Sequence, residues 1–140
     1  MECELCKIIE EKYRLICEDE YSFCIVAQNP LKPGHILVLP KRHVSELSDL
    51  SEKEAKSLFN ISEKIKKSIE EVYKEGAIIH INTGKHMSQG QHIHIHILPS
   101  KGSIRQHVSL YEKVPEVKDM HKDEMEKIKE TILESLNQHL

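Results

Sequence analysis

The stretch His92-Ile93-His94-Ile95-His96-Ile97-Leu98 alternates histidine with aliphatic residues. A β-strand sends successive side chains to opposite faces, so the alternation predicts one face of histidines and one face of isoleucines. Residues on one face of a strand lie roughly 6.5–7 Å apart, which would let three imidazoles address one ligand in different roles. We therefore expect a strand over residues 91–98 with buried isoleucines and with histidines that face a functional site.

Four further strands and two helices are predicted around this segment. Between the third and fourth strands, Ser51 and Glu54 form the capping box of a long helix, and Gly76 is expected to end it. The four strands are expected at residues 14–17, 21–27, 35–39 and 77–82. The pattern indicates an α+β fold, with an antiparallel meander of about five strands, a long central helix and a C-terminal helix.

Both helices are predicted from apolar stripes with helical spacing. The stripe of the central helix consists of Ala55, Leu58, Ile61, Ile65, Ile69 and Val72. The stripe of the C-terminal helix consists of Met125, Ile128, Ile132 and Leu136. We expect one domain over residues 1–140, in which residues 118–140 are a helical extension that docks on a neighbouring element or a partner chain.

Composition and charge narrow the class of protein. The chain has 140 residues, 39% hydrophobic and 31% charged, as in ordinary soluble domains, and no apolar run has the length of a membrane span. A formal net charge of −3 provides no general attraction to nucleic acid or to an anionic membrane, so small ligands are the expected partners. The start Met1-Glu2-Cys3-Glu4 lacks the features of a secretory signal, which favours a cytoplasmic protein without disulfides.

The histidine-rich strand is open to more than one functional interpretation. Neutral imidazole is the commonest protein ligand for zinc, and alternating histidines could hold one catalytic ion, as in a metal-dependent hydrolase. Alternatively, an imidazole that is unprotonated at neutral pH can act as a nucleophile. A solvated strand face is the third interpretation. At the N-terminus, Cys3 and Cys6 form a Cys-x-x-Cys pair, which is typical of either a zinc site or a redox pair.

Two blocks of the sequence resemble the histidine-triad family. The first is the segment 92–98, in which histidines alternate with hydrophobic residues. The second is Pro33-Gly34-His35-Ile36-Leu37-Val38-Leu39-Pro40-Lys41-Arg42-His43, which is similar to the family's strand and Pro-Lys-x-His turn. The resemblance implies a homodimeric α+β protein that binds purine nucleotides and catalyses hydrolysis or transfer at an α-phosphate.

The resemblance also implies a role for individual residues. His94 would be the nucleophile that forms a nucleotidyl-histidine intermediate, while His96 and Gln89 would contact the phosphate or the leaving group. Asn82 would help hold the nucleotide, and His35 would support the triad. Substrates would be nucleoside phosphoramidates or dinucleoside polyphosphates, and no organic cofactor is implied.

Two departures from the family pattern leave alternatives open. Ala27 stands where the family often has the Asp or Asn that holds the ribose hydroxyls. This makes a nucleotide-binding regulatory module with little turnover a second candidate. The stretch from Asn82 to His92 is one residue shorter than usual, so Gln89 and Gln91 compete for the glutamine role.

The N-terminal cysteine pair resembles that of the zinc-binding bacterial and archaeal branch of the family. That resemblance implies a structural zinc held by Cys3, Cys6, His43 and His92. Two cysteines and two histidines are also the tetrahedral donor set that structural zinc prefers.

Overall fold

The computed structural model describes residues 3–83, 92–102, 104 and 120–139. The chain divides into two compact units, Met1–Lys101 and Gly102–Leu140. The first unit contains the sheet, and the second contains the helix α4 (Lys122–His139). The expected C-terminal helix is thus present. That the whole chain is one domain, with residues 118–140 as a helical extension, stays a prediction.

The first unit is built on a five-stranded sheet in which every pair of neighbouring strands is antiparallel. This confirms the predicted α+β class. The strands are β1 (Leu15–Glu18), β2 (Ser22–Val26), β3 (Ile36–Pro40), β4 (Gly76–Ile81) and β5 (Ile95–Ser100).

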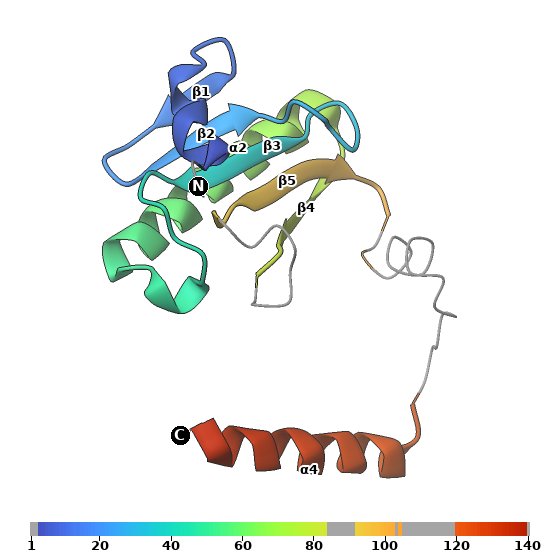
Figure 1. Ribbon diagram of the computed structural model, residues 1–140. Coiled ribbons are helices and arrows are strands. Elements are labelled where there is room, and N and C mark those ends of the chain that lie inside the picture. Colours follow the sequence, from blue (N-terminus) through green and yellow to red (C-terminus); the bar gives the residue numbers. More distant parts are fainter. Residues whose placement is uncertain (1–2, 84–91, 103, 105–119, 140) are drawn as a thin grey trace. The chain divides into compact units, whose positions relative to one another are not determined.

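The strand order departs from a simple meander at one place. The order is β1-β2-β3-β5-β4, so the last strand lies between β3 and β4 (Figure 1). Because both β3 and β4 run antiparallel to β5, they are parallel to each other. Parallel strands need a crossover connection, and the long helix α2 (Glu52–Tyr73) provides it.

The helix α2 begins where the capping box predicts and ends earlier than expected. The Glu54 backbone N–H donates to Ser51 Oγ at 3.1 Å, and the Ser51 N–H donates to Glu54 Oε1 at 2.9 Å. The helix ends at Tyr73, because Lys74 adopts a left-handed conformation with φ 56° and its N–H bonds to the Glu70 carbonyl. Gly76 therefore does not end the helix as expected, but begins β4.

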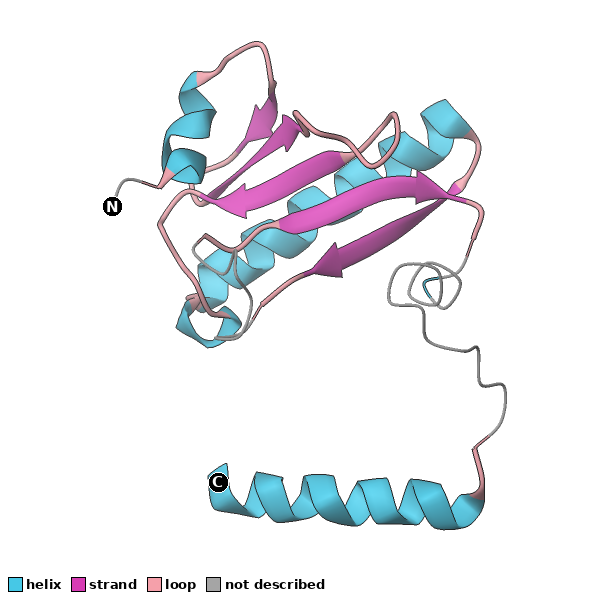
Figure 2. Ribbon diagram, turned by 45° about the vertical axis from the view of Figure 1, so that its right-hand side comes forward, coloured by secondary structure: helices cyan, strands magenta, loops and turns pink. Residues whose placement is uncertain are grey.

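The main core lies between α2 and one face of the sheet. Figure 2 shows α2 running along this face. The centre of the predicted stripe is buried, whereas its two ends, Ala55 and Val72, are exposed. The core residues from helix and sheet are Cys24, Val38, Leu58, Ile61, Ile65, Ile69 and Ile97.

A second apolar cluster lies on the other face, over β2 and β3. The N-terminal helical turns α1 (Glu4–Lys7) and η1 (Ile8–Glu10) supply residues that pack on it. The buried members are Phe23, Ile25, Ala27, Leu37 and Leu39. Since Leu37 pairs directly with His96, the histidine faces the same side of the sheet as this second cluster, away from α2.

The histidine strand begins later than the sequence predicts. Strand β5 starts at Ile95, so that His92 and His94 precede it and only His96 lies within it. The Ile93 N–H donates to the Val44 carbonyl at 2.7 Å, outside the sheet, and His92 contacts the N-terminal cysteines. These contacts hold residues 92–93 away from the strand pairing, so the predicted strand over residues 91–98 forms only from Ile95 onward.

Gly34, just before β3, occupies a conformation that other residues rarely adopt. Its φ is +94°, and an added Cβ would lie 2.7 Å from the Tyr73 ring and 3.0 Å from Pro99. We expect Gly34→Ala to lower the free energy of unfolding by about 1–3 kcal/mol, measured by chemical denaturation. Gly76→Ala is the matched control, since a Cβ there would meet nothing closer than 3.4 Å. Equal stability losses in the two variants would contradict the assignment of strain to Gly34.

Three further findings concern a short turn before α2, the length and hydropathy of the helices, and α4. A short helical turn, η2 (Leu47–Asp49), precedes α2. No helix in the described ranges is both long and apolar enough to cross a membrane. In α4, the four residues of the predicted stripe are each about half exposed, and their docking partner stays a prediction.

Candidate active site

Four histidines gather on the sheet face that α2 does not cover. His35 precedes β3, His80 lies in β4, and His94 and His96 lie before and within β5. The register pairs His80 directly with His96, which places both side chains on the same face. His35 is buried and the other three are half-buried, so the cluster is partly open to a ligand.

A chain of hydrogen bonds sets the protonation of His35 and His96. The Leu31 backbone N–H donates to His35 Nδ1 at 3.1 Å, so the hydrogen of a neutral His35 is on Nε2. His35 Nε2 then donates to His96 Nδ1 at 2.9 Å. A neutral His96 consequently carries its hydrogen on Nε2, where it can be donated to a ligand.

His96 stays neutral over the physiological pH range. Burial, followed by repulsion from a positive charge on His94, His80 or His35, lowers its pKa from 6.5 to about 3. At neutral pH the ring is therefore an uncharged hydrogen-bond donor. It can stabilise charge on a phosphate oxygen, but it is not a cationic acid.

His94 has the opposite arrangement of donor and acceptor. Its Nδ1 lies 3.0 Å from the His92 carbonyl oxygen. A carbonyl only accepts, so Nδ1 carries the hydrogen and Nε2 carries the free lone pair. The His94 ring lies next to that of His96, with ring centroids 4.7 Å apart. A ring nitrogen with a free lone pair and a neutral hydrogen-bond donor are thus neighbours in one site.

The predicted metal ligands come together beside this site. One donor atom from each of Cys3, Cys6, His43 and His92 can be chosen so that all lie within 4.8 Å of one another. His92 Nδ1 lies 3.5 Å from Cys3 Sγ and 3.3 Å from Cys6 Sγ, and His43 Nδ1 lies 3.3 Å from Cys6 Sγ. His92 Nε2 donates to the Pro40 carbonyl at 2.9 Å, which leaves Nδ1 as the metal-binding atom. The four residues therefore form a group that could hold a metal ion.

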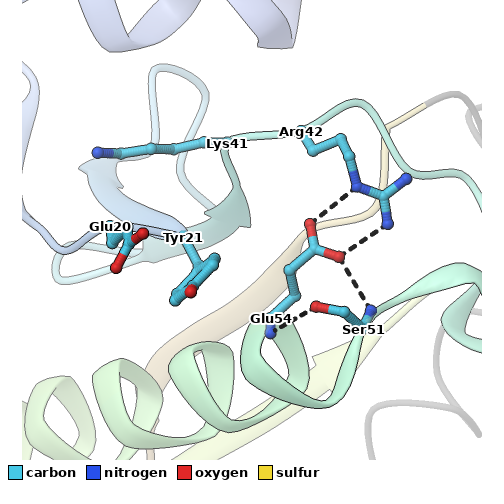
Figure 3. Close-up of a pocket in the computed structure, with 6 residues that line it drawn as sticks. All are labelled: Glu20, Tyr21, Lys41, Arg42, Ser51 and Glu54. Atoms are coloured by element: carbon cyan, nitrogen blue, oxygen red, sulfur yellow. Dashed lines mark hydrogen bonds and ion pairs between the residues drawn. The ribbon is translucent and has the colours of Figure 1, made fainter.

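An ion pair anchors the loop that carries His43. Arg42 Nε and Nη2 donate to the two oxygens of Glu54 at 3.0 and 2.7 Å (Figure 3). Nη2 also donates to the Asp49 carbonyl. A pocket of about 390 Å³ lies here, and no histidine lines it. Its lining residues Arg42 and Glu54 pair with each other, and its Lys41 pairs with Glu18 outside the lining. The pocket is thus separate from the histidine cluster, and we assign the Arg42–Glu54 pair a structural role.

The Arg42–Glu54 pair predicts a specific dependence of stability on pH. The bond from Arg42 is the main cause that lowers the pKa of Glu54 from 4.5 to about 2, so the stabilisation is complete above pH 4.5 and disappears as the pH falls towards 2. We expect Glu54→Gln to be less stable than the unaltered protein at pH 7, with a difference that shrinks between pH 4.5 and 2. Denaturant titrations across this range measure it, with the exposed Glu52→Gln as control. A difference independent of pH would argue against the pair.

The other residues named from the sequence are Asn82, Gln89, Gln91 and Ala27. Asn82 directly follows β4 with an exposed side chain, while Gln89 and Gln91 lie outside the described residues. Ala27 is buried, and its N–H donates to the His35 carbonyl at 3.1 Å, which places it beside the site.

The sequence interpretation missed His80. Its signal was a lone histidine within an isoleucine-rich strand, which gains meaning only from the β4–β5 register.

The chain is similar to a known protein family and to several curated proteins. Residues 9–103 match the HIT domain family. A bis(5′-adenosyl)-triphosphatase of Dictyostelium discoideum is 39% identical over 84 residues, which cover 59% of this chain and 56% of that protein. A bis(5′-nucleosyl)-tetraphosphatase of Schizosaccharomyces pombe is 39% identical over 82 residues, 57% of this chain and 45% of that protein. The chain thus spans about half the length of these curated relatives.

The fold has a counterpart among solved structures. The crystal structure of a HIT family protein from Bacillus anthracis superposes with a TM-score of 0.71 at 25% identity, covering 99% of this chain and 97% of that one. The similarity extends over both units of the chain, whereas the family match covers most of the first. Since that match includes more than half of the residues, the chain belongs to the HIT domain family.

Proposed function

We propose that this protein is a nucleotidyl hydrolase or transferase that cleaves at the α-phosphate of a nucleotide through a covalent intermediate on His94. One observation supports this most strongly. The bond from His94 Nδ1 to the His92 carbonyl leaves the Nε2 lone pair free, next to the neutral donor His96. A nucleophile and a donor for the phosphate oxygens are the two groups that such a displacement needs.

The reaction proceeds in two displacements at phosphorus. In the first, the His94 Nε2 lone pair forms a bond to the α-phosphorus, and the bond from phosphorus to the leaving-group oxygen or nitrogen breaks. The leaving atom keeps the electron pair of that bond, and a leaving nitrogen takes up a proton from solvent. In the second, water attacks the phosphorus, the P–N bond breaks, the lone pair returns to Nε2 and the water loses a proton to solvent. A nucleophilic acceptor other than water would make the second step a transfer.

The neighbouring groups stabilise charge in both steps. The His92 carbonyl oxygen accepts from His94 Nδ1–H, and this bond becomes stronger when the ring becomes positively charged. The His96 Nε2–H donates to a non-bridging phosphate oxygen, while His35 holds the other ring nitrogen of His96.

We propose dinucleoside polyphosphates and nucleoside phosphoramidates as the substrate classes, with a purine nucleotide as the bound portion. The names of the Dictyostelium and Schizosaccharomyces relatives support the polyphosphates. AMP release from diadenosine triphosphate, diadenosine tetraphosphate and adenosine phosphoramidate tests the proposal. Turnover of at least one substrate is expected, whereas AMP binding without turnover of any would favour a nucleotide-binding module, which Ala27 makes conceivable.

A metal-dependent hydrolysis by the three histidines has less support. In the described ranges, the group of side chains able to hold a metal includes His92 but neither His94 nor His96. We infer instead that Cys3, Cys6, His43 and His92 hold a structural zinc, which would tie the N-terminus to the segment that precedes β5. A chelator should then lower the free energy of unfolding, while the rate of the chemical step in protein that remains folded should change little.

We further propose a homodimer formed through β4 and α2. Strand β4 is the last strand of the sheet, and an apolar groove of about 300 Å³ lies beside it. Phe59 is 65% exposed and Ile79 is 43% exposed at this groove. A second copy related by two-fold symmetry would present the same edge and the same apolar side chains, which makes the surface self-complementary.

The dimer is tested by light scattering at micromolar concentration. The unaltered protein is expected at twice the mass of the chain, and Phe59→Asp at the mass of a monomer, because a carboxylate would be desolvated in the interface. Tyr13→Asp, which changes an exposed aromatic residue outside the groove, should remain dimeric. A monomeric unaltered protein would overturn the proposal.

The cytoplasmic location that the sequence favours also remains a prediction.

A further inference from the structure

The His96 ring has a third aromatic neighbour besides His35 and His94. The ring of His80 lies parallel to it, with centroids 4.4 Å apart and planes at 4°. Cross-strand pairing of His80 with His96 across β4 and β5 brings the two rings together. This near-parallel geometry is that of an aromatic stack, which contributes more than the burial of the same area.

We propose that His80 is a positioning residue for the reaction, which sets the plane of the His96 ring and thereby the direction of its Nε2–H. This inference depends on the proposed function of the same site. His80 acts through His96 and is not a catalytic residue.

The geometry of His96 explains why a second constraint is needed. The bond from His35 Nε2 holds one atom of the His96 ring, Nδ1, at 2.9 Å. A single hydrogen bond fixes the direction of that nitrogen but leaves the ring able to tilt about the bond. Contact with a flat ring on one face restricts the tilt. Together, His35 and His80 leave Nε2 as the ring nitrogen available to a phosphate oxygen.

The charge of His80 is compatible with this stack. Burial, followed by repulsion from a positive charge on His94, lowers the pKa of His80 below its ordinary value. The face of a neutral His80 therefore meets a neutral His96, and no like-charge repulsion opposes the contact. The contact needs a flat ring but not a titrating group, so phenylalanine should replace His80 better than alanine does.

The first part of the experiment is kinetic. We expect His80→Ala to lower kcat about tenfold while KM changes less than about twofold, because misdirecting a hydrogen bond that strengthens in the transition state weakens the transition state more than substrate binding. His80→Phe should keep kcat within about threefold of the unaltered protein. Ile78→Ala is the matched control, since Ile78 lies on the same strand as His80 and pairs with Leu98 of β5.

The second part measures the stack directly by NMR of the carbon-bound ring protons of His96. Loss of the stacked ring in His80→Ala should move these resonances downfield, whereas His80→Phe should preserve their upfield position. Thermal unfolding of each variant verifies folding. The phenylalanine variant provides the comparison if the alanine variant is unstable.

The outcomes separate this inference from the proposed function. Unchanged kcat in His80→Ala, unchanged His96 resonances, or equal kcat losses in His80→Ala and Ile78→Ala would overturn the role of His80 alone. A similar loss of kcat in the alanine and phenylalanine variants would also overturn it. If the unaltered protein turns over none of the substrates, the proposed function fails, and the role of His80 fails with it.

Discussion

His94→Ala is expected to reduce AMP release by about 10³- to 10⁵-fold while the protein still folds and binds nucleotide. The variant lacks the Nε2 lone pair that forms the P–N bond, and each ~1.4 kcal/mol of lost transition-state stabilisation is tenfold in rate. The fold should survive because the His94 side chain is only half-buried and belongs to neither apolar cluster. Steady-state AMP release and nucleotide binding measure the two effects separately.

The covalent intermediate can be observed directly in the same series. A substrate radiolabelled at the α-phosphate, quenched before steady state, should label the unaltered protein, and mass spectrometry should place the label on His94. Free imidazole should partly restore turnover to His94→Gly by occupying the space of the missing ring. His121→Ala changes a histidine of the second unit and is the matched control. Label on another residue, or near-normal turnover by His94→Ala, would refute the assignment.

Loss of the proposed zinc ion should lower the thermal stability more than any other change considered. We expect one zinc per chain in the purified protein, and we expect Cys6→Ala to lose it and to lower Tm by about 10 °C or more. Removing one of the four ligands abolishes zinc binding, and the free energy of zinc binding contributes to the stability of the folded protein. Metal analysis and thermal unfolding are the measurements.

Cys17→Ala is the control for the zinc experiment, since Cys17 is a half-buried cysteine that does not belong to the metal cluster. It should keep the zinc and most of the thermal stability. A purified protein without zinc, together with an unchanged Tm in Cys6→Ala, would show that the cluster is not a metal site. The zinc should matter for catalysis only through folding, so the rate of chemistry in protein that remains folded should survive brief chelation.

The elements that depend on local pattern could be predicted from the sequence. The capping box at Ser51 and Glu54 and the stripe of Leu58, Ile61 and Ile65 specify a helix through contacts within a few residues, and the helix forms where they predict. Its C-terminus was harder to locate, because Lys74 takes the left-handed conformation that glycine is expected to take.

Features that depend on long-range contacts could not be predicted in this way. The alternation over residues 92–98 is that of a strand, but the contacts of His92 with the N-terminal cysteines and with Pro40 delay the start of β5 to Ile95. The approach of His80 to His96 depends on β5 lying between β3 and β4. Strand order is set by the crossover of α2 over the sheet, and a local pattern does not contain that information.

The proposed zinc site of Cys3, Cys6, His43 and His92 affects the order in which parts of the fold can form during synthesis. Its cysteines lie 86 and 89 residues before His92 in the chain. An ion bound there would close a loop of that length, and the entropy that a covalent cross-link of comparable span removes from the unfolded chain corresponds to about 4–5 kcal/mol. During synthesis both cysteines are made long before His92, so this loop cannot close until nearly the whole sheet-bearing unit has been translated. The N-terminal turns could thus pack on β2 and β3 early, whereas their link to His92 through the ion would form late.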